Sequence, residues 1–297
     1  MKEFTWNDLQ DYTNKDSKVR EYFSQENCPY GSAITIGGFD GMHKGHQALF
    51  STVLSQKRSS MSQNENSKGV SKVGVVTFSR SPREFKQKNN FPGNLSTNRL
   101  RRYYFENKGF DFCVVIDFSD DFSRMKGHDF LTVLRNSCSM QLLSVGTDFR
   151  CGRGLDTGVF EIEQYCLQYG LKFIVCAEVL YQDMRISSSA VRCAIQKGEL
   201  VFAAHLLGYN YTLDGSVFKW HKTKTINKKL KSVSRAISAH KSDSLQVLPP
   251  VGTYPVNAAG FDTVMYVDSK FLHLEIPLEQ GCPATVTKIE FRNPMKE

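Results

Sequence analysis

Short apolar runs alternate with amphipathic stretches across residues 33–207, and this alternation constrains the fold more than any other feature. Five of the runs are rich in β-branched residues and short enough for buried strands. They are Ala33–Ile36, Val73–Phe78, Phe112–Ile116, Leu142–Val145 and Lys172–Cys176. Helical periodicity occurs between them at about Gly45–Lys57, Thr97–Asn107, Gly127–Asn136 and Phe160–Tyr169. Repeated strand-then-helix order predicts a Rossmann-like α/β domain whose parallel sheet is covered on both faces.

A different pattern follows residue 210. Short alternating runs at Thr263–Val267, Phe271–Ile276 and Ala284–Phe291 indicate strands with no helical stretch between them. We therefore expect two domains, an α/β domain over residues 1–210 and a small β-rich domain over residues 211–297.

The net charge of +8 is concentrated in one segment. Lys219–Lys241 contains seven lysines, one arginine and no acidic residue, so the rest of the chain is close to neutral. A basic run can bind nucleic acid, but this one has Trp220 and no ladder of aromatics for stacking bases. We expect a solvated or mobile loop there, and no nucleic-acid partner. Arg58–Lys72 is polar without periodicity and is expected to be a flexible insertion.

The sequence lacks the features of a membrane-spanning, secreted or zinc-binding protein. No stretch approaches the roughly 18 unbroken apolar residues that would span a membrane. The first residues lack the apolar core of a secretory signal, so a cytoplasmic protein without a membrane partner is expected. The eight cysteines form no C-x-x-C pair and no zinc-finger spacing with histidine. We expect free thiols and no protein-bound metal, while the sequence leaves the oligomeric state open.

The first chemical motif runs from the Ala33–Ile36 strand through a glycine-dense turn into a helix. Its letters are Gly37-Gly38-Phe39-Asp40-Gly41-Met42-His43-Lys44-Gly45-His46. Glycines let the backbone approach a ligand, and a helix N-terminus attracts anions. Two imidazoles there can donate hydrogen bonds to phosphate oxygens. The segment is not a P-loop, because the chain has no G-x-x-x-x-G-K-[ST]. Metal ligation lacks a third ligand at recognisable spacing, and purely structural histidines fit the surrounding glycines poorly.

Two further segments carry anion-binding or ligand-binding character. Ser187, Ser188 and Ser189 precede a helix, where a cap needs only one serine, and Arg192 follows one turn later. Val145–Gly154 follows a predicted strand and therefore lies at the carboxyl edge of the sheet, where ligands bind in such folds. It contains no G-x-G-x-x-G, so a dinucleotide fingerprint is not indicated. A structural turn and a ligand loop both remain open for it.

In their order along the chain, these segments resemble the prokaryotic bifunctional riboflavin kinase/FMN adenylyltransferase family. The resemblance rests on six elements, which are G-x-F-D-G-[VM]-H-x-G-H, then T-F-x-x-x-P at Thr77–Pro82, then V-G-x-D-F-R-x-G, then I-S-S-S-x-x-R, then Gly198-Glu199-Leu200, and then Leu206-Leu207-Gly208. It covers about residues 30–218. The first element and the I-S-S-S-x-x-R element are also similar to the signatures of the wider nucleotidyltransferase superfamily.

The resemblance implies an adenylyltransferase module that binds ATP with Mg²⁺, takes FMN as substrate, and releases FAD and pyrophosphate. By analogy His43, His46 and Arg192 would be catalytic. The nucleotide-binding set would comprise Gly37, Gly38, Phe39, Asp40, Gly45, Ser187, Ser188 and Ser189. The flavin side would comprise Thr77, Phe78, Asp148 and Phe149. The phosphate of FMN is already ionised at pH 7, so positioning and charge neutralisation can drive the reaction without a general base.

The chain also departs from the family pattern. Arg80 and Ser81 replace the Pro and His of a usual T-F-x-P-H-P, and Cys151 replaces a usual Phe. Where the family has the kinase element G-R-x-L-G-x-P-T-A-N, this chain has the basic stretch Lys219–Lys241. We therefore expect a degenerate kinase barrel and no riboflavin kinase activity. The alternatives are another adenylyl- or cytidylyltransferase, a non-catalytic flavin or nucleotide binder, and a nucleic-acid-binding protein.

Overall fold

The computed structural model describes residues 1–58, 69–80, 91–227, 232–276 and 286–292. The chain divides into two compact units. The first unit comprises Met1–Phe39, Gly45–Phe91 and Arg102–Leu180. The second unit comprises Asp40–Lys44, Pro92–Arg101 and Tyr181–Glu297.

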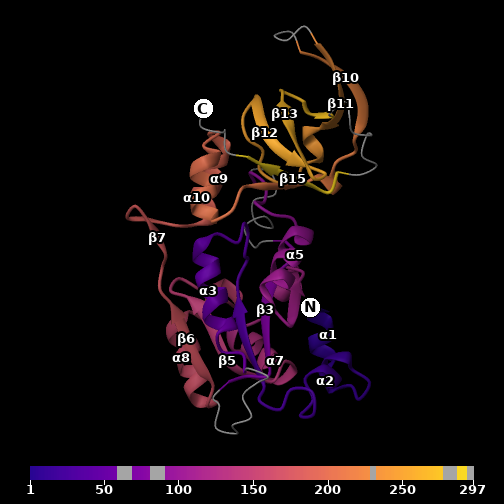
Figure 1. Cartoon of the computed structure of the whole chain (residues 1–297). Helices are drawn as coiled ribbons and strands as arrows, with labels where there is room; N and C mark the ends of the chain where they lie inside the picture. The colour runs from indigo at the N-terminus through magenta and orange to yellow at the C-terminus, as the bar shows by residue number, and fades with distance from the viewer. Residues whose placement is uncertain (59–68, 81–90, 228–231, 277–285, 293–297) are drawn as a thin grey trace. The chain divides into compact units, whose positions relative to one another are not determined.

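The first unit contains a six-stranded sheet in the order β1-β4-β3-β2-β5-β6, and all of its strand pairs are parallel (Figure 1). The strands are β1 Lys2–Thr5, β2 Ser32–Ile36, β3 Lys72–Phe78, β4 Phe112–Ile116, β5 Met140–Gly146 and β6 Lys172–Cys176. Leaving aside the edge strand β1, the order reverses between β2 and β5, as in doubly wound α/β folds. The predicted α/β class and the five predicted strands are confirmed.

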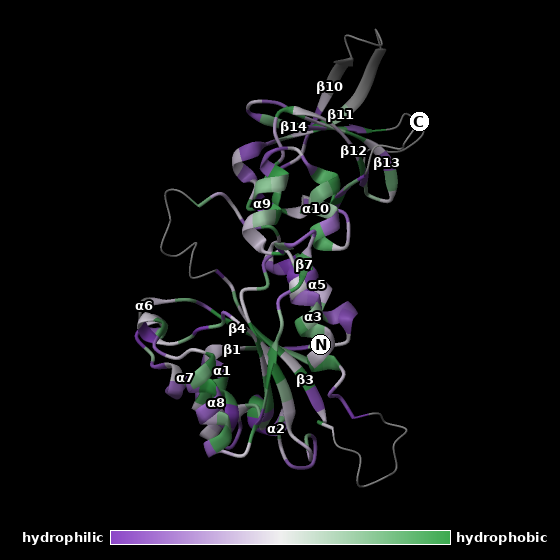
Figure 2. Cartoon of the chain, turned by 90° about the vertical axis from the view of Figure 1, so that its left-hand side faces the viewer, coloured by the Kyte–Doolittle hydropathy of each residue, from purple (hydrophilic) through white to green (hydrophobic). Residues whose placement is uncertain are grey.

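Helices cover both faces of this sheet. They are α1 Trp6–Gln10, α2 Lys18–Tyr22, α3 Lys44–Leu54, α5 Asn98–Lys108, α6 Asp120–Ser123, α7 Gly127–Ser137 and α8 Val159–Gln168. Figure 2 shows α1, α7 and α8 on one side of the strands and α3 on the other. On the first side Ile34 and Ile36 belong to the same buried cluster as Leu131 of α7. Burial on both faces explains why the central strands β2, β3 and β4 are largely apolar.

The edge strand β1 and helix α1 lacked a sequence signal because they are too short for periodicity. Only Phe4 of β1 is buried. A capping box fixes the junction between the two elements. The hydroxyl of Thr5 accepts from Asp8 N at 3.2 Å, and the Asp8 carboxylate accepts from Thr5 N at 2.6 Å. The strand itself is held by parallel pairing with β4, a contact that local sequence cannot reveal.

The second unit contains a seven-stranded sheet in the order β10-β11-β14-β13-β12-β15-β9, in which every pair is antiparallel. The strands are β9 Thr212–Asp214, β10 His221–Asn227, β11 Ser232–His240, β12 Gly252–Ala258, β13 Phe261–Val267, β14 Phe271–Ile276 and β15 Lys288–Phe291. A β-rich region after the α/β region is therefore confirmed. Helices α9 Ser188–Gln196 and α10 Leu200–Leu207 lie side by side (Figures 1 and 2). The short strands β7 Leu180–Tyr181 and β8 Met184–Arg185 pair with each other.

The expectation of a loop over Lys219–Lys241 is wrong for most of that segment. Strands β10 and β11 occupy it, paired from His221↔Ser238 to Asn227↔Ser232. Strand β11 also pairs with β14, which supplies backbone partners that a charge count does not reveal. The β-branched Thr, Ile and Val residues in the segment favour extended backbone. Residues 228–231 lie outside the described residues, as do residues 59–68 of the expected insertion.

Along the sequence, the strands of the first sheet precede residue 210 and those of the second sheet follow it. The second unit nevertheless also contains α9, α10 and the earlier segments Asp40–Lys44 and Pro92–Arg101. The domain boundary after residue 210 stays a proposal. Among the described residues, no helix is long and apolar enough to cross a membrane.

Candidate active site

The turn between β2 and α3 has an unusual backbone. Phe39 and Met42 have left-handed φ angles of 45° and 35°, and Gly41 between them has φ of 82°. Non-glycine residues with positive φ are rare, and they cost energy that the surrounding structure must offset. The strained turn coincides with the G-G-F-D-G-M-H motif, as expected for a segment that serves a ligand.

Gly37 and Gly38 have different roles in this turn. A Cβ atom on Gly37 would lie 2.8 Å from the ring of Phe39, so glycine is needed there for close packing. A Cβ on Gly38 would meet no described atom within 4 Å, so its backbone is open to a ligand. The Phe39 ring is buried and packs edge-on against Phe50 at a centroid distance of 4.9 Å. Its predicted contact with nucleotide would therefore have to come from its backbone.

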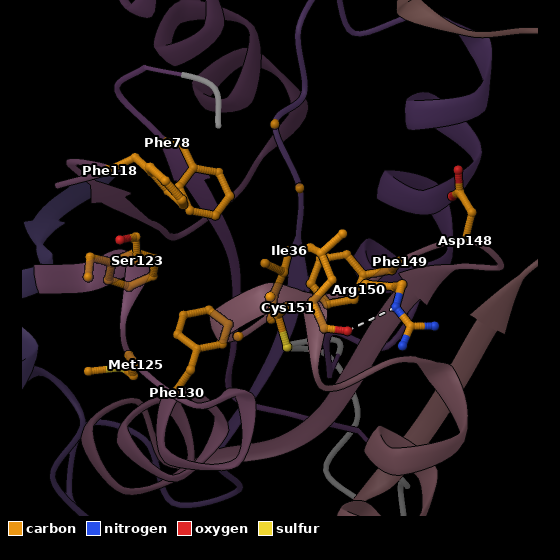
Figure 3. A pocket seen from close by; sticks show the side chains of 16 residues that line it. Ile36, Phe78, Phe118, Ser123, Met125, Phe130, Asp148, Phe149, Arg150 and Cys151 are labelled. Carbon is orange, nitrogen blue, oxygen red and sulfur yellow. Dashed lines mark hydrogen bonds between the residues drawn. The ribbon is translucent and has the colours of Figure 1, made fainter. Parts of the chain in front are cut away.

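The first unit contains a pocket of about 550 Å³ at the carboxyl ends of four neighbouring strands (Figure 3). Its lining comes from the segments that follow β2, β3, β4 and β5, and the labelled residues are Ile36, Phe78, Phe118, Ser123, Met125, Phe130, Asp148, Phe149, Arg150 and Cys151. Gly37 and Gly38 also line it. The pocket thus includes the point between β2 and β5 where the strand order reverses, the usual ligand site of such sheets.

Aromatic rings dominate the pocket. Phe78, Phe118 and Phe122 lie 5.8 to 6.1 Å apart between centroids, and Phe130 lies 5.8 Å from Phe122. Figure 3 shows Phe78 and Phe118 side by side, with Phe130 across the cavity from them. Such a lining suits a flat, largely apolar ring system, and the volume is that of a small-molecule site.

Three of the four residues predicted for the flavin side line this pocket, namely Phe78, Asp148 and Phe149. Asp148 lies on the opposite side of the view from Phe78 and Phe118 in Figure 3. Thr77 is buried instead, and its hydroxyl donates to the Gly38 carbonyl at 3.3 Å, so it supports the glycine turn.

Sequence reasoning missed several of the pocket's apolar residues. Phe118, Phe122, Met125 and Phe130 all lie in or near the segment that follows β4. The sequence contains a signal that could have predicted them. Phe118-x-x-x-Phe122 comes directly after an apolar strand, so these rings lie at the same edge of the sheet as the motifs. Arg150 lies at the rim, where its Nε donates to the Leu155 carbonyl at 3.0 Å.

Cys151 contributes a thiol to the pocket. Burial, together with the negative charge of Asp156, raises the pKa of Cys151 to about 12. The thiol is therefore protonated at neutral pH and acts as a small apolar group.

In the second unit, Asp40 is an anchor for two distant segments of the chain. Its carboxylate accepts from the backbone N–H groups of Leu95 at 2.8 Å and Ser96 at 3.0 Å. It also accepts from Arg192 Nη2 at 2.5 Å, and Asp40 is only 8% exposed. Sequence analysis placed Asp40 among the nucleotide-binding residues, and that assignment stays a proposal. In the structure its carboxylate accepts hydrogen bonds from protein donors.

The serine-rich start of α9 divides its hydroxyls among different partners. Ser187 caps the helix by accepting from Ala190 N at 3.2 Å, and Ser188 donates to the Asp40 carbonyl at 2.8 Å. Ser189 is exposed. Arg192 is buried one turn later, and its Nε donates to the Gly93 carbonyl at 3.0 Å. The phosphate-binding role of these serines and of Arg192 stays a proposal. The hydrogen bonds described above fix the positions of Ser187, Ser188 and Arg192.

The two motif histidines have different surroundings. His43, in the second unit, is 6% exposed, and burial together with the positive charge of Arg185 lowers the pKa of His43 to about 4. It is neutral at pH 7 and can donate one N–H. His46, in the first unit, follows Gly45 in the first turn of α3, and its ring lies edge-on to Phe39 at 5.3 Å.

The depressed pKa of His43 predicts a pH-dependent stability. The unfolded chain takes up a proton near pH 6.5, whereas the folded chain does so only near pH 4. The contribution of the neutral ring is therefore complete above about pH 6.5 and is lost as the pH falls towards 4. Between pH 7 and pH 4, wild type should lose about 3 kcal/mol more free energy of unfolding than His43→Gln. Urea titrations at both pH values measure this, and equal losses would show that the ring is solvated.

Comparison with known proteins identifies the family. The family model described as FAD synthetase matches residues 25–190. The chain belongs to the FAD synthetase family. It is 27% identical over 238 residues to a bifunctional riboflavin kinase/FMN adenylyltransferase from Buchnera aphidicola, covering 80% of this chain and 71% of that protein.

Two further relatives show how much of each protein is covered by this similarity. The chain is 29% identical over 188 residues to the bifunctional riboflavin kinase/FMN adenylyltransferase of Escherichia coli, covering 63% of this chain and 57% of that protein. It is 26% identical over 205 residues to a FAD synthetase from Listeria monocytogenes, covering 69% of this chain and 74% of that protein. The matches thus span from just over half to about three quarters of these relatives.

A solved structure shares the fold. A crystal structure titled as a macrolide-efflux protein from Streptococcus pneumoniae matches with a TM-score of 0.73 and 18% identity, covering 100% of this chain and 93% of that one. At this identity the likeness bears on fold alone. Among the described residues, no group of three or more His, Cys, Asp or Glu side chains could hold a metal ion.

Proposed function

We propose that this chain is an FMN adenylyltransferase, which makes FAD and pyrophosphate from FMN and ATP. The observation that carries the proposal is the aromatic pocket at the strand-order reversal of a FAD synthetase family member. The flat isoalloxazine ring suits that lining. The phosphate-binding motif is continuous with the pocket along the chain, because Gly37 and Gly38 line the pocket and Asp40 and His43 follow directly.

In the proposed reaction, a phosphate oxygen of FMN attacks the α-phosphorus of ATP. A new P–O bond forms, the bond from the α-phosphorus to the bridging oxygen breaks, and pyrophosphate leaves with the electron pair. Donors from His43 and His46 and the charge of Arg192 would hold the triphosphate and offset the developing charge. Mg²⁺ would arrive bound to the phosphates of ATP and neutralise part of their charge.

We also propose that the C-terminal β region has no riboflavin kinase activity. Strands β10 and β11 and their basic residues stand where the resemblance places the P-T-A-N element of the kinase. The proposed partners are therefore ATP and FMN, in the cytoplasm.

One assay with two arms tests both proposals. Purified protein with ATP and Mg²⁺ should convert FMN into FAD with release of pyrophosphate, and should leave riboflavin unchanged. Chromatographic separation of the flavins measures both products. Folded protein that yields no FAD would exclude the adenylyltransferase, and FMN formed from riboflavin would exclude the loss of kinase activity.

A further inference from the structure

The segment Pro92–Arg101 is held between two buried carboxylates of the second unit. On one side, Asp40 accepts from the backbone of Leu95 and Ser96. On the other side, Asp214 in β9 accepts from the Thr97 hydroxyl at 2.5 Å and from Arg99 Nη2 at 2.6 Å. The segment thus connects the motif aspartate to the C-terminal sheet.

Asp214 is built to stay ionised. It is only 1% exposed, and its carboxylate also accepts from Ser216 N at 3.1 Å. Burial alone would raise the pKa of Asp214, but hydrogen bonds from Arg99, Ser216 and Thr97 lower it below its usual value. A buried carboxylate with this many donors fixes the position of each one.

Gln246 joins the same segment to β9 through a single side-chain amide. Its Oε1 accepts from Asp214 N at 2.7 Å, and its Nε2 donates to the carbonyls of Leu95 at 2.8 Å and Thr212 at 2.9 Å. Gln246 is 4% exposed, so three backbone groups depend on this amide where water is largely excluded. The neighbouring backbone adds a bond from Val247 N to the Asn94 carbonyl at 2.9 Å.

The contacts form a short path from the C-terminal sheet to Arg192. Gln246 holds the carbonyl of Leu95, and the N–H of Leu95 is held by Asp40, the ion-pair partner of Arg192. The carbonyl of Gly93, in the same segment, accepts from Arg192 Nε. Two groups that contact the guanidinium, the Asp40 carboxylate and the Gly93 carbonyl, are therefore placed by a segment that is itself fixed by β9 and Gln246.

We infer that Gln246 and Asp214 are positioning residues for the adenylyl transfer, acting through Leu95, Asp40 and Arg192. The inference rests on the proposed function, because it assigns Arg192 to the phosphates of ATP. It gives the C-terminal β region a role in this reaction that is independent of any kinase chemistry. Charge-stabilising groups must be held to a fraction of an ångström, so loosening the support slows catalysis even when the charged residue is intact.

The test is Gln246→Met, which keeps the volume and removes all three hydrogen bonds. The folded variant should make FAD with kcat reduced by about tenfold or more, bind ATP more weakly, and bind FMN as wild type does. The matched control is Thr263→Val. It removes a bond from the Thr263 hydroxyl to the Glu275 carbonyl within the same sheet and should leave all three values unchanged.

A double-mutant cycle separates positioning from general destabilisation. If Gln246 acts through Arg192, Gln246→Met should cost little further activity in an Arg192→Ala background. Fully additive losses, or wild-type kcat and ATP binding in folded Gln246→Met, would overturn the inference. If wild type makes no FAD but Gln246→Met still weakens ATP binding as Arg192→Ala does, the proposed function fails and the positioning role stands.

A second pair of variants keeps the inference testable if Gln246→Met does not fold. Thr97→Val keeps the shape of the side chain and removes its bond to Asp214, while Thr97→Ser keeps the hydroxyl. The serine variant should retain wild-type kcat and the valine variant should not. Equal kcat in the two variants would contradict the path through Asp214.

Discussion

Asp40→Ala should lower the free energy of unfolding by about 3–5 kcal/mol. The change removes the carboxylate that forms an ion pair with the buried guanidinium of Arg192. It also removes the acceptor for the N–H groups of Leu95 and Ser96. Removing one partner of a buried ion pair costs far more than the intact pair contributes, and each backbone donor that loses its acceptor adds to that cost. Urea denaturation followed by circular dichroism measures the loss.

The matched control for this prediction is an exposed ion pair. Asp117 and Arg80 lie 3.6 Å apart with side chains 66% and 57% exposed, so Asp117→Ala should change stability by about 0.5 kcal/mol or less. Similar losses in the two variants would mean that the Asp40 carboxylate is accessible to water. That outcome would remove the basis for treating it as an anchor.

His46→Ala should reduce kcat for FAD formation by about a hundred- to a thousandfold while leaving the fold intact. This effect is expected if the imidazole donor acts mainly on charge that develops in the transition state, where loss of one donor costs about 2.7–4 kcal/mol. Binding of ATP would change much less than kcat. Arg192→Ala should differ, because in the proposed site its charge would already engage the ground-state triphosphate, and because Arg192 also holds Asp40 and Gly93. Steady-state kinetics and thermal unfolding of both variants separate the two patterns.

Two controls accompany His46→Ala. Ser51→Ala changes an exposed position on the same helix and should leave the kinetics unchanged. His46→Gln retains a side-chain N–H and should recover part of the lost rate. Wild-type kcat in folded His46→Ala would show that the ring only packs against Phe39.

The sequence was sufficient for the central strands of the parallel sheet, because strands buried on both faces need nearly continuous apolar runs. The β4 run Phe112–Ile116 and the β6 run Lys172–Cys176 match their predicted bounds. Strands β10 and β11 were missed because the many lysines of this segment suggested a solvated loop. The two strands pair with each other, and β11 also pairs with β14, and these contacts cannot be read from local sequence. A run of charged residues indicates exposed side chains, but it does not exclude a strand, because a strand at the edge of a sheet can carry many charges.

The candidate site was predictable only where its signal is local. The glycine turn and the serines of α9 could be read from adjacent letters. The partners of Asp40 could not, because Leu95 lies 55 positions away and Arg192 lies 152 positions away. The sequence placed Asp40 in the nucleotide-binding set, which stays a proposal, and did not reveal that its carboxylate binds two distant segments of the chain.

The packing of Trp6 gives the protein an optical reporter. The indole lies 5.3 Å from Phe122 and 5.4 Å from Phe130 between ring centroids, and both phenylalanines line the pocket. A flavin in that pocket would sit one side-chain layer away and would accept excitation energy from the indole. The chain has only two tryptophans, Trp6 and Trp220. In a Trp220→Phe background, the remaining emission comes from Trp6 alone, so quenching of this single fluorophore follows occupancy of the pocket in real time.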